Sequence, residues 1–379
     1  MHDIHGRPTI AEVSLAALRT NCRRAQELVG PKVAVMAVVK ADGYGHGAVA
    51  VARAFLEAGA AALGVSSVEE AVELRRGKVK GPVVVLGGTF PGQEKEVVQH
   101  DLATAVWSLD GARALAAAAK KARRTVAVHL KLNTGMTRLG VEPADAPRVA
   151  TALGELAGLR IDGLFSHLAS ADAVDTASAR AQIARFADAV AAVADAGLRP
   201  PYVHLANSAA VIAAPEAHFS MVRPGIMLYG CAPASHLAAR AQVRPALRLR
   251  SAVAQVRHVP AGTPVGYGAT FVTARPSAIA TVPIGYADGY HRLNSNRAHM
   301  ILGGRRVPVA GRVCMDHTML DVTDAGAVAA GDPVVAIGAS GGAAVPADEV
   351  AGWSETISYE VLTSIGRRVP RVYVEEFDV

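Results

Sequence analysis

Short apolar runs that alternate with helix-like stretches constrain the fold of this chain more than any other feature. The first run, residues 33–39, is unbroken and of strand length, as expected of a parallel strand covered on both faces. Seven further runs follow, with helical stretches between most of them, at residues 62–65, 83–86, 104–107, 126–131, 161–165, 202–205 and 220–222. Eight such units in about 230 residues predict an α/β fold with a (β/α)8 barrel, and a doubly wound open sheet is the alternative.

The alternation of strand-like and helix-like segments ends after Tyr229 and Gly230. The remaining sequence carries Val, Thr, Pro and Gly in short alternating runs, such as residues 247–253 and 307–310. Such runs are typical of a β-rich domain. We therefore expect a barrel domain over residues 1–240 that binds a cofactor, and a C-terminal β-rich domain over residues 241–379.

Composition excludes several classes of protein. Charged residues make up 19% of the chain and no apolar run approaches the ~18 residues of a membrane span, so no membrane partner is expected. The net charge of +6 is small for 379 residues and the arginines are scattered, which argues against nucleic acid as a partner. Three distant cysteines and an N-terminus without an apolar stretch favour the cytoplasm. His2 and His5 lack a third ligand, so no metal is assigned.

Polar residues follow the predicted strands at the end of the barrel where active sites lie. Lys40 ends the first apolar run, where partial burial favours a neutral, nucleophilic amine, although a strand-end lysine can also simply reach solvent. Later strands are followed by Lys131, Arg138, His167, Asn207, Ser208 and Arg223. Their convergence with Lys40 predicts a planar, anionic ligand bound covalently to an amine. Ser208 with the N–H groups of Gly225 and Ile226 is suited to hold a phosphate.

A second motif in the first loop points to a different cofactor. Gly45, Gly47 and Ala50 satisfy the G-x-G-x-x-A pattern of dinucleotide-binding loops. That pattern needs its first glycine directly after the strand, but residues 40–44 intervene, and no acidic residue follows at the required distance before Glu69. We therefore favour the amine-bound ligand over a nicotinamide.

Eight motifs in the same order resemble those of one family, the pyridoxal-phosphate-dependent alanine racemases. The resemblance covers essentially the whole chain and rests on residues 37–47, 131–140, 165–172, 223–230, 265–268, 284–290, 311–316 and 357–360. It implies the barrel, the β-rich second domain and pyridoxal 5′-phosphate as the cofactor. The implied reaction is the interconversion of L-alanine and D-alanine, which supplies D-alanine for peptidoglycan.

The resemblance also implies how the cofactor is held. Lys40 would form a Schiff base with it, and Arg223 would face its pyridine nitrogen. The phosphate would be held by Tyr44, Ser208, Gly225, Ile226 and Tyr359, with His167 and Asn207 also beside the cofactor. Because a guanidinium only donates hydrogen bonds, the ring would stay uncharged and act as a weak electron sink, which favours racemisation over decarboxylation and transamination.

Racemisation needs a base on each face of the reacting carbon. The family likeness implies Lys40 on one face and, on the other, Tyr267 from the partner chain of a head-to-tail homodimer with shared active sites. Arg138 and the N–H of Met315 would bind the substrate carboxylate. Lys131 matches a lysine that carries a carbamate and orients Arg138, although Asn133 stands where many members have aspartate.

A narrow gate completes the implied site and restricts the substrate to a small side chain. Its residues are Asp172, Tyr286, Arg292, Arg312, Asp316 and Tyr359. Two alternatives remain open, a broad-specificity amino-acid racemase and a non-catalytic pyridoxal-phosphate carrier, although carriers of that kind resemble the barrel alone. A decarboxylase would need an acidic group in place of Arg223.

Overall fold

The computed structural model describes residues 6–378 and divides the chain into two compact units. The barrel unit consists of residues 18–43 and 48–244. Among the described residues, the β unit consists of residues 6–17, 44–47 and 245–378. His2 and His5 lie outside the described residues. Within residues 6–378, no helix is both long and apolar enough to cross a membrane.

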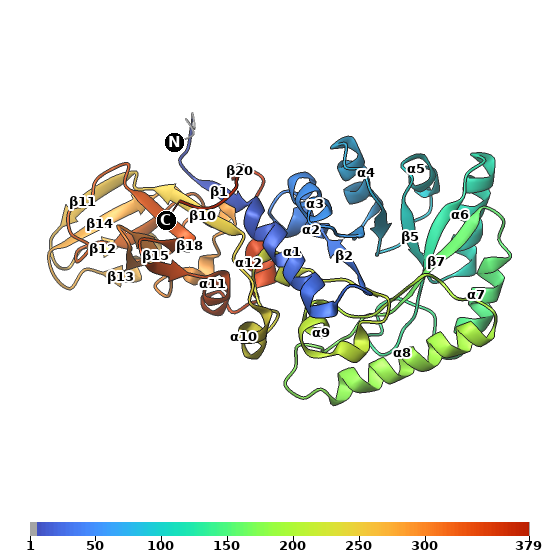
Figure 1. Ribbon diagram of the computed structural model, residues 1–379. Helices are drawn as coiled ribbons and strands as arrows, with labels where there is room; N and C mark the ends of the chain where they lie inside the picture. Colours follow the sequence, from blue (N-terminus) through green and yellow to red (C-terminus); the bar gives the residue numbers. More distant parts are fainter. Residues whose placement is uncertain (1–5, 379) are drawn as a thin grey trace. The chain divides into compact units, whose positions relative to one another are not determined.

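Eight parallel strands close the barrel (Figure 1). They are β2 (Ala34–Val38), β3 (Ala62–Val65), β4 (Val83–Val85), β5 (Ala103–Val106), β6 (Val126–Lys131), β7 (Leu159–Phe165), β8 (Tyr202–His204) and β9 (Met221–Val222). Each strand pairs with the next along the chain, and β9 pairs back with β2 through Ala34 and Met221. This closure confirms the predicted barrel and excludes the open sheet.

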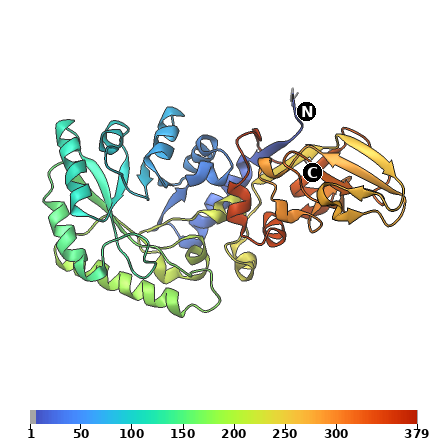
Figure 2. The same cartoon turned by 180° about the vertical axis from the view of Figure 1, so that it is seen from behind.

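Helices cover the outside of the strands, and α8 runs along the barrel in both views (Figure 2). The helices of this part of the chain are α1 (Leu15–Val29), α2 (Lys40–Tyr44), α3 (Ala48–Glu57), α4 (Val68–Arg76), α5 (Glu94–Gln99), α6 (Leu109–Lys121), α7 (Ala146–Gly154), α8 (Ala177–Asp195), α9 (Ser208–Ala213) and α10 (Ala238–Ala241). Short 3₁₀ turns are η1 (Pro143–Asp145), η2 (Pro215–Ala217), η3 (Ile226–Tyr229) and η4 (Ser235–Leu237).

Local sequence signals explain where several helices begin. The hydroxyl of Ser14 accepts a hydrogen bond from the N–H of Ala17 at the start of α1. Ser67 and Glu70 form a capping box at the start of α4, in which each side chain satisfies a backbone N–H at the other residue. The same glutamate also bonds the loop after β2, so this cap contributes to the site described below.

The β unit contains three sheets, which confirms the predicted β-rich part. The largest has seven strands, in the order β16 (Arg305–Pro308), β15 (His299–Leu302), β18 (Pro333–Ser340), β10 (Leu247–Ala252), β1 (Ile10–Ser14) and β20 (Arg371–Val374), with β19 (Ala343–Val345) beside β18. The smaller sheets are formed by β11 (Gln255–Val259), β14 (Ser277–Val282) and β17 (Thr318–Asp321), and by β12 (Pro264–Val265) with β13 (Phe271–Val272). The other elements are α11 (Ala347–Trp353), α12 (Ser358–Thr363), η5 (Tyr267–Ala269), η6 (Tyr286–Asp288) and η7 (Arg292–Asn294).

The N-terminal strand β1 was not expected from the sequence. It pairs antiparallel with β10 and parallel with β20, so residues from the start of the chain lie inside a sheet made largely by its last third. Apolar and polar residues alternate only over residues 11–14, the shortest run that indicates a strand, and the polar members Glu12 and Ser14 are buried as well, which explains why the pattern gave little signal.

Candidate active site

Lys40 lies directly after β2, at the start of an unusual turn. Ala41, Asp42 and Gly43 all have left-handed backbone angles, with φ of 53°, 53° and 60°. For residues other than glycine this conformation costs about 1–2 kcal/mol each, so surrounding contacts must hold it. The N–H of Ala41 donates to Glu70 (2.7 Å), and the Asp42 carboxylate accepts from the N–H of Ala48 (2.8 Å). These two bonds fix the position of the Lys40 backbone at the C-terminal end of the strand.

Four basic side chains converge at this end of the barrel. Lys131, at the end of β6, is buried, and its Nζ lies 5.1 Å from the centre of the Phe165 ring. Arg223, which follows β9, has its Cζ 5.3 Å from the same ring. Burial and the charges of Arg223, Arg138 and Lys40 lower the pKa of Lys131 to about 8. The amine of Lys131 is therefore partly neutral near physiological pH.

Lys40 experiences the same positive surroundings. Its side chain is exposed at the barrel mouth, yet desolvation by the neighbouring protein lowers its pKa, the charge of Arg138 lowers it further, and Glu70 partly opposes the shift. A lysine with a lowered pKa holds more of its neutral, nucleophilic form. The role of this amine as a nucleophile stays a prediction.

Arg223 is buried and held by a dense set of acceptors. Its Nη1 donates to Nδ1 of His204 (2.8 Å), and its Nη2 donates to the carbonyl of Ser166 (2.7 Å) and to Nδ1 of His167 (3.3 Å). Burial lowers the pKa of Arg223, but a guanidinium remains protonated near neutral pH. Burial and this charge hold the pKa of both histidines well below the usual value, so both rings are neutral. The Nε–H of Arg223 has no hydrogen-bond partner within the described chain.

Donors suited to an anion lie between two short helices of the barrel unit. The Asn207 side chain caps α9 by accepting from the N–H of Ala210. The Ser208 hydroxyl oxygen accepts from the N–H of Gly225 (2.9 Å) and more weakly from that of Met227 (3.4 Å), so its own hydrogen is free to donate. The N–H of Ile226 has no partner among residues 6–378. Gly225 thus positions Ser208, while Ser208 and Ile226 retain free donors.

The β unit carries the predicted second base on a glycine-flanked turn. Tyr267 is 71% exposed and stands between Gly266 and Gly268, which both have φ of 72°. A Cβ at Gly268 would lie 3.2 Å from the guanidinium of Arg312. Arg312 therefore lies directly against the turn that presents Tyr267.

A second loop pair in the β unit brings Tyr286 and Met315 together. The N–H of Tyr286 donates to the carbonyl of Cys314 (3.0 Å), and the next N–H along the chain donates to the carbonyl of Met315 (3.0 Å). A Cβ at Gly285 would lie 2.3 Å from the Cys314 carbonyl, so only glycine permits this approach. The N–H of Met315 has no partner within the described residues, and Asp316 is paired with Arg368 (2.8 Å).

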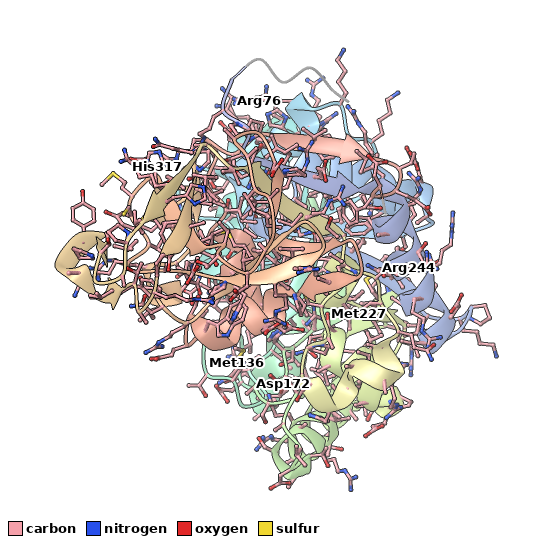
Figure 3. The ribbon with its side chains drawn as sticks, turned by 90° about the vertical axis from the view of Figure 1, so that its left-hand side faces the viewer. Arg76, Met136, Asp172, Met227, Arg244 and His317 are labelled. Atoms are coloured by element: carbon pink, nitrogen blue, oxygen red, sulfur yellow. The ribbon has the colours of Figure 1, made fainter. Side chains whose placement is uncertain are left out.

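The remaining predicted residues are distributed over both units. In the β unit, the rings of Tyr44 and Tyr359 lie 6.1 Å apart, centre to centre. Arg292, in η7, is exposed. Asp172, in the loop after β7, is also exposed, and Figure 3 labels it together with Met136 from the loop after β6. Each unit therefore carries its own group of predicted residues.

Sequence reasoning missed the buried polar residues behind Arg223. His204 and His129 lie within predicted strands and were not predicted as site residues. Nδ1 of His129 lies 2.8 Å from Nε2 of His204. Phe165 was noted only as a motif end, although its ring stacks on His204 at 4.8 Å and lies beneath both cations. Polar residues at alternate positions of an otherwise apolar strand, as at His129 and Lys131, are the signal that would have indicated them.

No metal site accompanies this arrangement within residues 6–378, where no three His, Cys, Asp or Glu side chains come together as ligands. The donor set consists instead of amines, a guanidinium, neutral imidazoles and free N–H groups. Such groups recognise anionic oxygen atoms and a ring nitrogen that accepts a hydrogen bond.

Comparison with known proteins agrees with the fold and these motifs. The family model for the alanine racemase N-terminal domain matches residues 13–233, and that for the C-terminal domain matches residues 246–373. An alanine racemase from Desulfovibrio desulfuricans is 43% identical over 97% of this chain and 99% of its own length. One from Symbiobacterium thermophilum is 46% identical over 98% of both chains.

Solved structures of alanine racemases are also similar to this chain. The alanine racemase from the D-cycloserine producer Streptomyces lavendulae has a TM-score of 0.93 and 38% identity over 98% of both chains. The alanine racemase from E. faecalis has a TM-score of 0.91 and 34% identity over 99% of this chain and 100% of its own. The chain belongs to the alanine racemase family of isomerases.

Proposed function

We propose that this enzyme interconverts L-alanine and D-alanine by a two-base reaction with pyridoxal 5′-phosphate bound to Lys40. One observation carries the proposal: the Lys40 amine has a lowered pKa, and a left-handed turn fixes the Lys40 backbone among the strand ends that carry Arg223 and Ser208. An amine with these properties is suited both to bind a carbonyl cofactor and to move a proton.

The residues present fit that cofactor. Ser208 and the N–H of Ile226 offer free donors for a phosphate, with Gly225, Asn207, Tyr44 and Tyr359 completing the proposed set. Arg223 has an unpaired Nε–H that is suited to a pyridine nitrogen, and His167 holds the guanidinium. When bound, the cofactor withdraws electrons from the substrate and acidifies the hydrogen on its reacting carbon.

The chain's own residues supply the proton transfers. Lys40 Nζ removes or returns the proton on one face, and the phenol oxygen of Tyr267 acts on the other. We propose that Tyr267 comes from the partner chain of a head-to-tail homodimer. Its exposure of 71% supports this, because an exposed tyrosine presented by its own turn is available to a second subunit.

Substrate binding needs a positive group and a free N–H. Arg138 and the N–H of Met315 are proposed to hold the alanine carboxylate. We propose that the neutral amine of Lys131 adds to carbon dioxide, forming an N–C bond and releasing one proton. The resulting carbamate anion orients Arg138 and relieves the repulsion among four clustered cations, which the lowered pKa of Lys131 supports.

Membership of the alanine racemase family also underlies the proposed gate and the proposed domain organisation. Tyr286, Arg312, Arg292, Asp172 and Asp316 would limit the side chain that reaches the cofactor. The barrel domain, residues 1–240, would bind the cofactor, and residues 241–379 would supply Tyr267. Cys22, Cys231 and Cys314 form no disulfide within residues 6–378, which supports a reducing compartment, the cytoplasm, where D-alanine would enter peptidoglycan synthesis.

Chemical trapping tests the proposal. The purified protein is mixed with pyridoxal 5′-phosphate, reduced with borohydride, digested and analysed by mass spectrometry, while D-alanine formation is measured on a parallel sample. We expect a phosphopyridoxyl group on Lys40 and loss of racemisation after reduction. The Lys40→Ala variant should lack both label and activity, and Lys32→Ala, which changes an exposed lysine just before β2, should retain both. Labelling of another lysine, or racemisation by Lys40→Ala, would contradict the role.

A further inference from the structure

A cavity lies at the opposite end of the barrel from Lys40. It opens at the N-terminal ends of the strands and has a volume of about 750 Å³. Barrel interiors are ordinarily filled by bulky branched side chains. Here three of the lining positions are Ala62, Ala103 and Ala127, and the volume they leave open is large enough for a small organic molecule.

His129 forms part of the wall of this cavity and connects it to the active site. Its Nδ1 lies 2.8 Å from Nε2 of His204, and Nδ1 of His204 lies 2.8 Å from Nη1 of Arg223. Three buried side chains thus form a continuous hydrogen-bonded row through the barrel. One end is the guanidinium proposed to face the cofactor, and the other end is the cavity.

The direction of the hydrogen bonds in this row is fixed by chemistry. Arg223 can only donate, so Nδ1 of His204 accepts and Nε2 of His204 carries the hydrogen. Nδ1 of His129 must then accept, which leaves the hydrogen of His129 on Nε2. Burial lowers the pKa of His129 to about 4, so the ring is neutral and has this single N–H. Nε2 of His129 has no partner among the described residues.

The hydrogen-bonded row of His129, His204 and Arg223 depends on the absence of a side chain at Gly163 on β7. A Cβ at this position would lie 2.0 Å from Nδ1 of His129. The backbone angle of Gly163 does not demand glycine, since it lies outside the left-handed region. The missing side chain is therefore what gives the His129 ring room to reach His204.

The cavity favours an anion with an apolar body. Its accessible apolar surface comes from Ala103, Ala127 and the ring of Tyr202. The charged residues of its lining are three cations, Arg75, Lys80 and Arg160, and two anions, Asp101 and Asp162. Arg160 is already paired with Asp162, and Arg75 donates to three backbone carbonyls. Lys80 remains as an exposed ammonium that forms no ion pair within the described chain.

We propose that this cavity is a regulatory binding site for a short-chain alkyl carboxylate. A carboxylate oxygen accepts the hydrogen bond of His129 Nε2, and the alkyl chain lies against Ala103, Ala127 and Tyr202. His204 couples binding in the cavity to Arg223. Hydrogen bonds in a chain polarise one another, so the guanidinium makes His129 a stronger donor. By the same coupling, a bound anion draws the Arg223 N–H toward His204 and away from the active site.

Proton NMR with butyrate as the probe tests binding directly. A buried imidazole N–H gives a resonance at low field, and that of His129 is identified by its loss in His129→Phe. In the holoenzyme we expect butyrate to shift this resonance saturably and n-butylamine to leave it in place. A resonance that does not respond to butyrate overturns the proposed site, and this measurement does not depend on which reaction the enzyme catalyses.

Matched variants locate the binding. Ala103→Leu fills the cavity and should weaken the butyrate response at least about tenfold. Ala117→Leu makes the same change on the exposed face of α6 and should leave it unchanged. Lys80→Ala removes an exposed charge without altering the core, and it should weaken binding about threefold or more. An equal response in wild type and both cavity variants overturns the assignment to this cavity.

Kinetics separate this cavity from the substrate site, where a carboxylate could also bind. Butyrate that competes at the substrate site raises the KM for alanine and leaves kcat unchanged. Butyrate in the cavity should instead lower kcat about twofold to fivefold. The effect on kcat should disappear in Ala103→Leu while any competitive effect remains. A saturable NMR response with unchanged kcat would overturn the coupling to Arg223.

Discussion

Gly163 and His129 face each other inside the barrel so closely that a single methyl group at Gly163 would lie 2.0 Å from Nδ1 of His129. The contact fixes the ring on which the His129–His204–Arg223 row depends. The absence of a side chain at Gly163 therefore helps to determine the geometry at the active site.

Gly163→Ala should therefore destabilise the protein and disturb Arg223. The displaced His129 ring loses its bond to His204, and we expect the free energy of unfolding to fall by about 1–3 kcal/mol in urea titrations. The low-field resonance of His129 should move in the folded variant. The control is Gly154→Ala at the exposed end of α7, where a Cβ meets nothing closer than 3.8 Å and alanine should be neutral or slightly stabilising. Equal stability of the two variants would refute the steric argument.

The pKa of Lys131 predicts when the carbamate forms. Its pKa is lowered to about 8, so the reactive neutral amine becomes abundant as the pH rises through 8, whereas an ordinary lysine needs a pH above 10. With ¹³C-bicarbonate present, we expect a carbamate carbon signal that grows between about pH 7 and pH 9. Lys131→Ala should lack the signal and bind alanine more weakly. A signal that persists in this variant would assign the carbamate to a different amine.

Subunit mixing tests the shared active site. Lys40→Ala and Tyr267→Ala are each expected to be inactive alone, because each lacks one base. After subunit exchange about half of the dimers are mixed, and each mixed dimer has one intact site of two, so about a quarter of wild-type activity should return. A mixture that remains inactive would place Tyr267 in the site of its own chain.

Substrate size tests the proposed gate. Alanine should have a much larger kcat/KM than leucine, because the additional carbon atoms must be forced past Tyr286, Arg292 and Arg312. The Tyr286→Ala variant should narrow the difference by raising the value for leucine. Comparable values for alanine and leucine in the wild type would favour the broad-specificity racemase.

Sequence patterns predicted the parts of this molecule that local chemistry determines. The eight barrel strands are short apolar runs with helices between them, and each was located because neighbouring residues along the chain are enough to define it. The polar residues after β2, β6 and β9 were found by the same reasoning, and their roles remain predictions. The family motifs identified the fold and the class of enzyme, which the comparisons confirmed.

Features that depend on distant partners were not predictable in this way. His129 and His204 are 75 residues apart, and only closure of the barrel brings their rings together. The requirement for glycine at Gly163 comes from a side chain on the neighbouring strand and leaves no local signal. β1 was missed for the same reason, since its partners β10 and β20 lie more than two hundred residues further along the chain.

The pairing of β1 with β10 and β20 also determines the order of events during synthesis. Roughly 230 residues separate Val13 from its partner Leu247, so at ~5–20 residues per second β1 waits about ten to fifty seconds for β10. Throughout that interval the ribosome is producing the barrel strands, and the unpaired backbone N–H and C=O groups of β1 make it prone to aggregation. Chaperone binding to the unpaired strand β1 is therefore expected to matter more for this protein than binding to the barrel that follows.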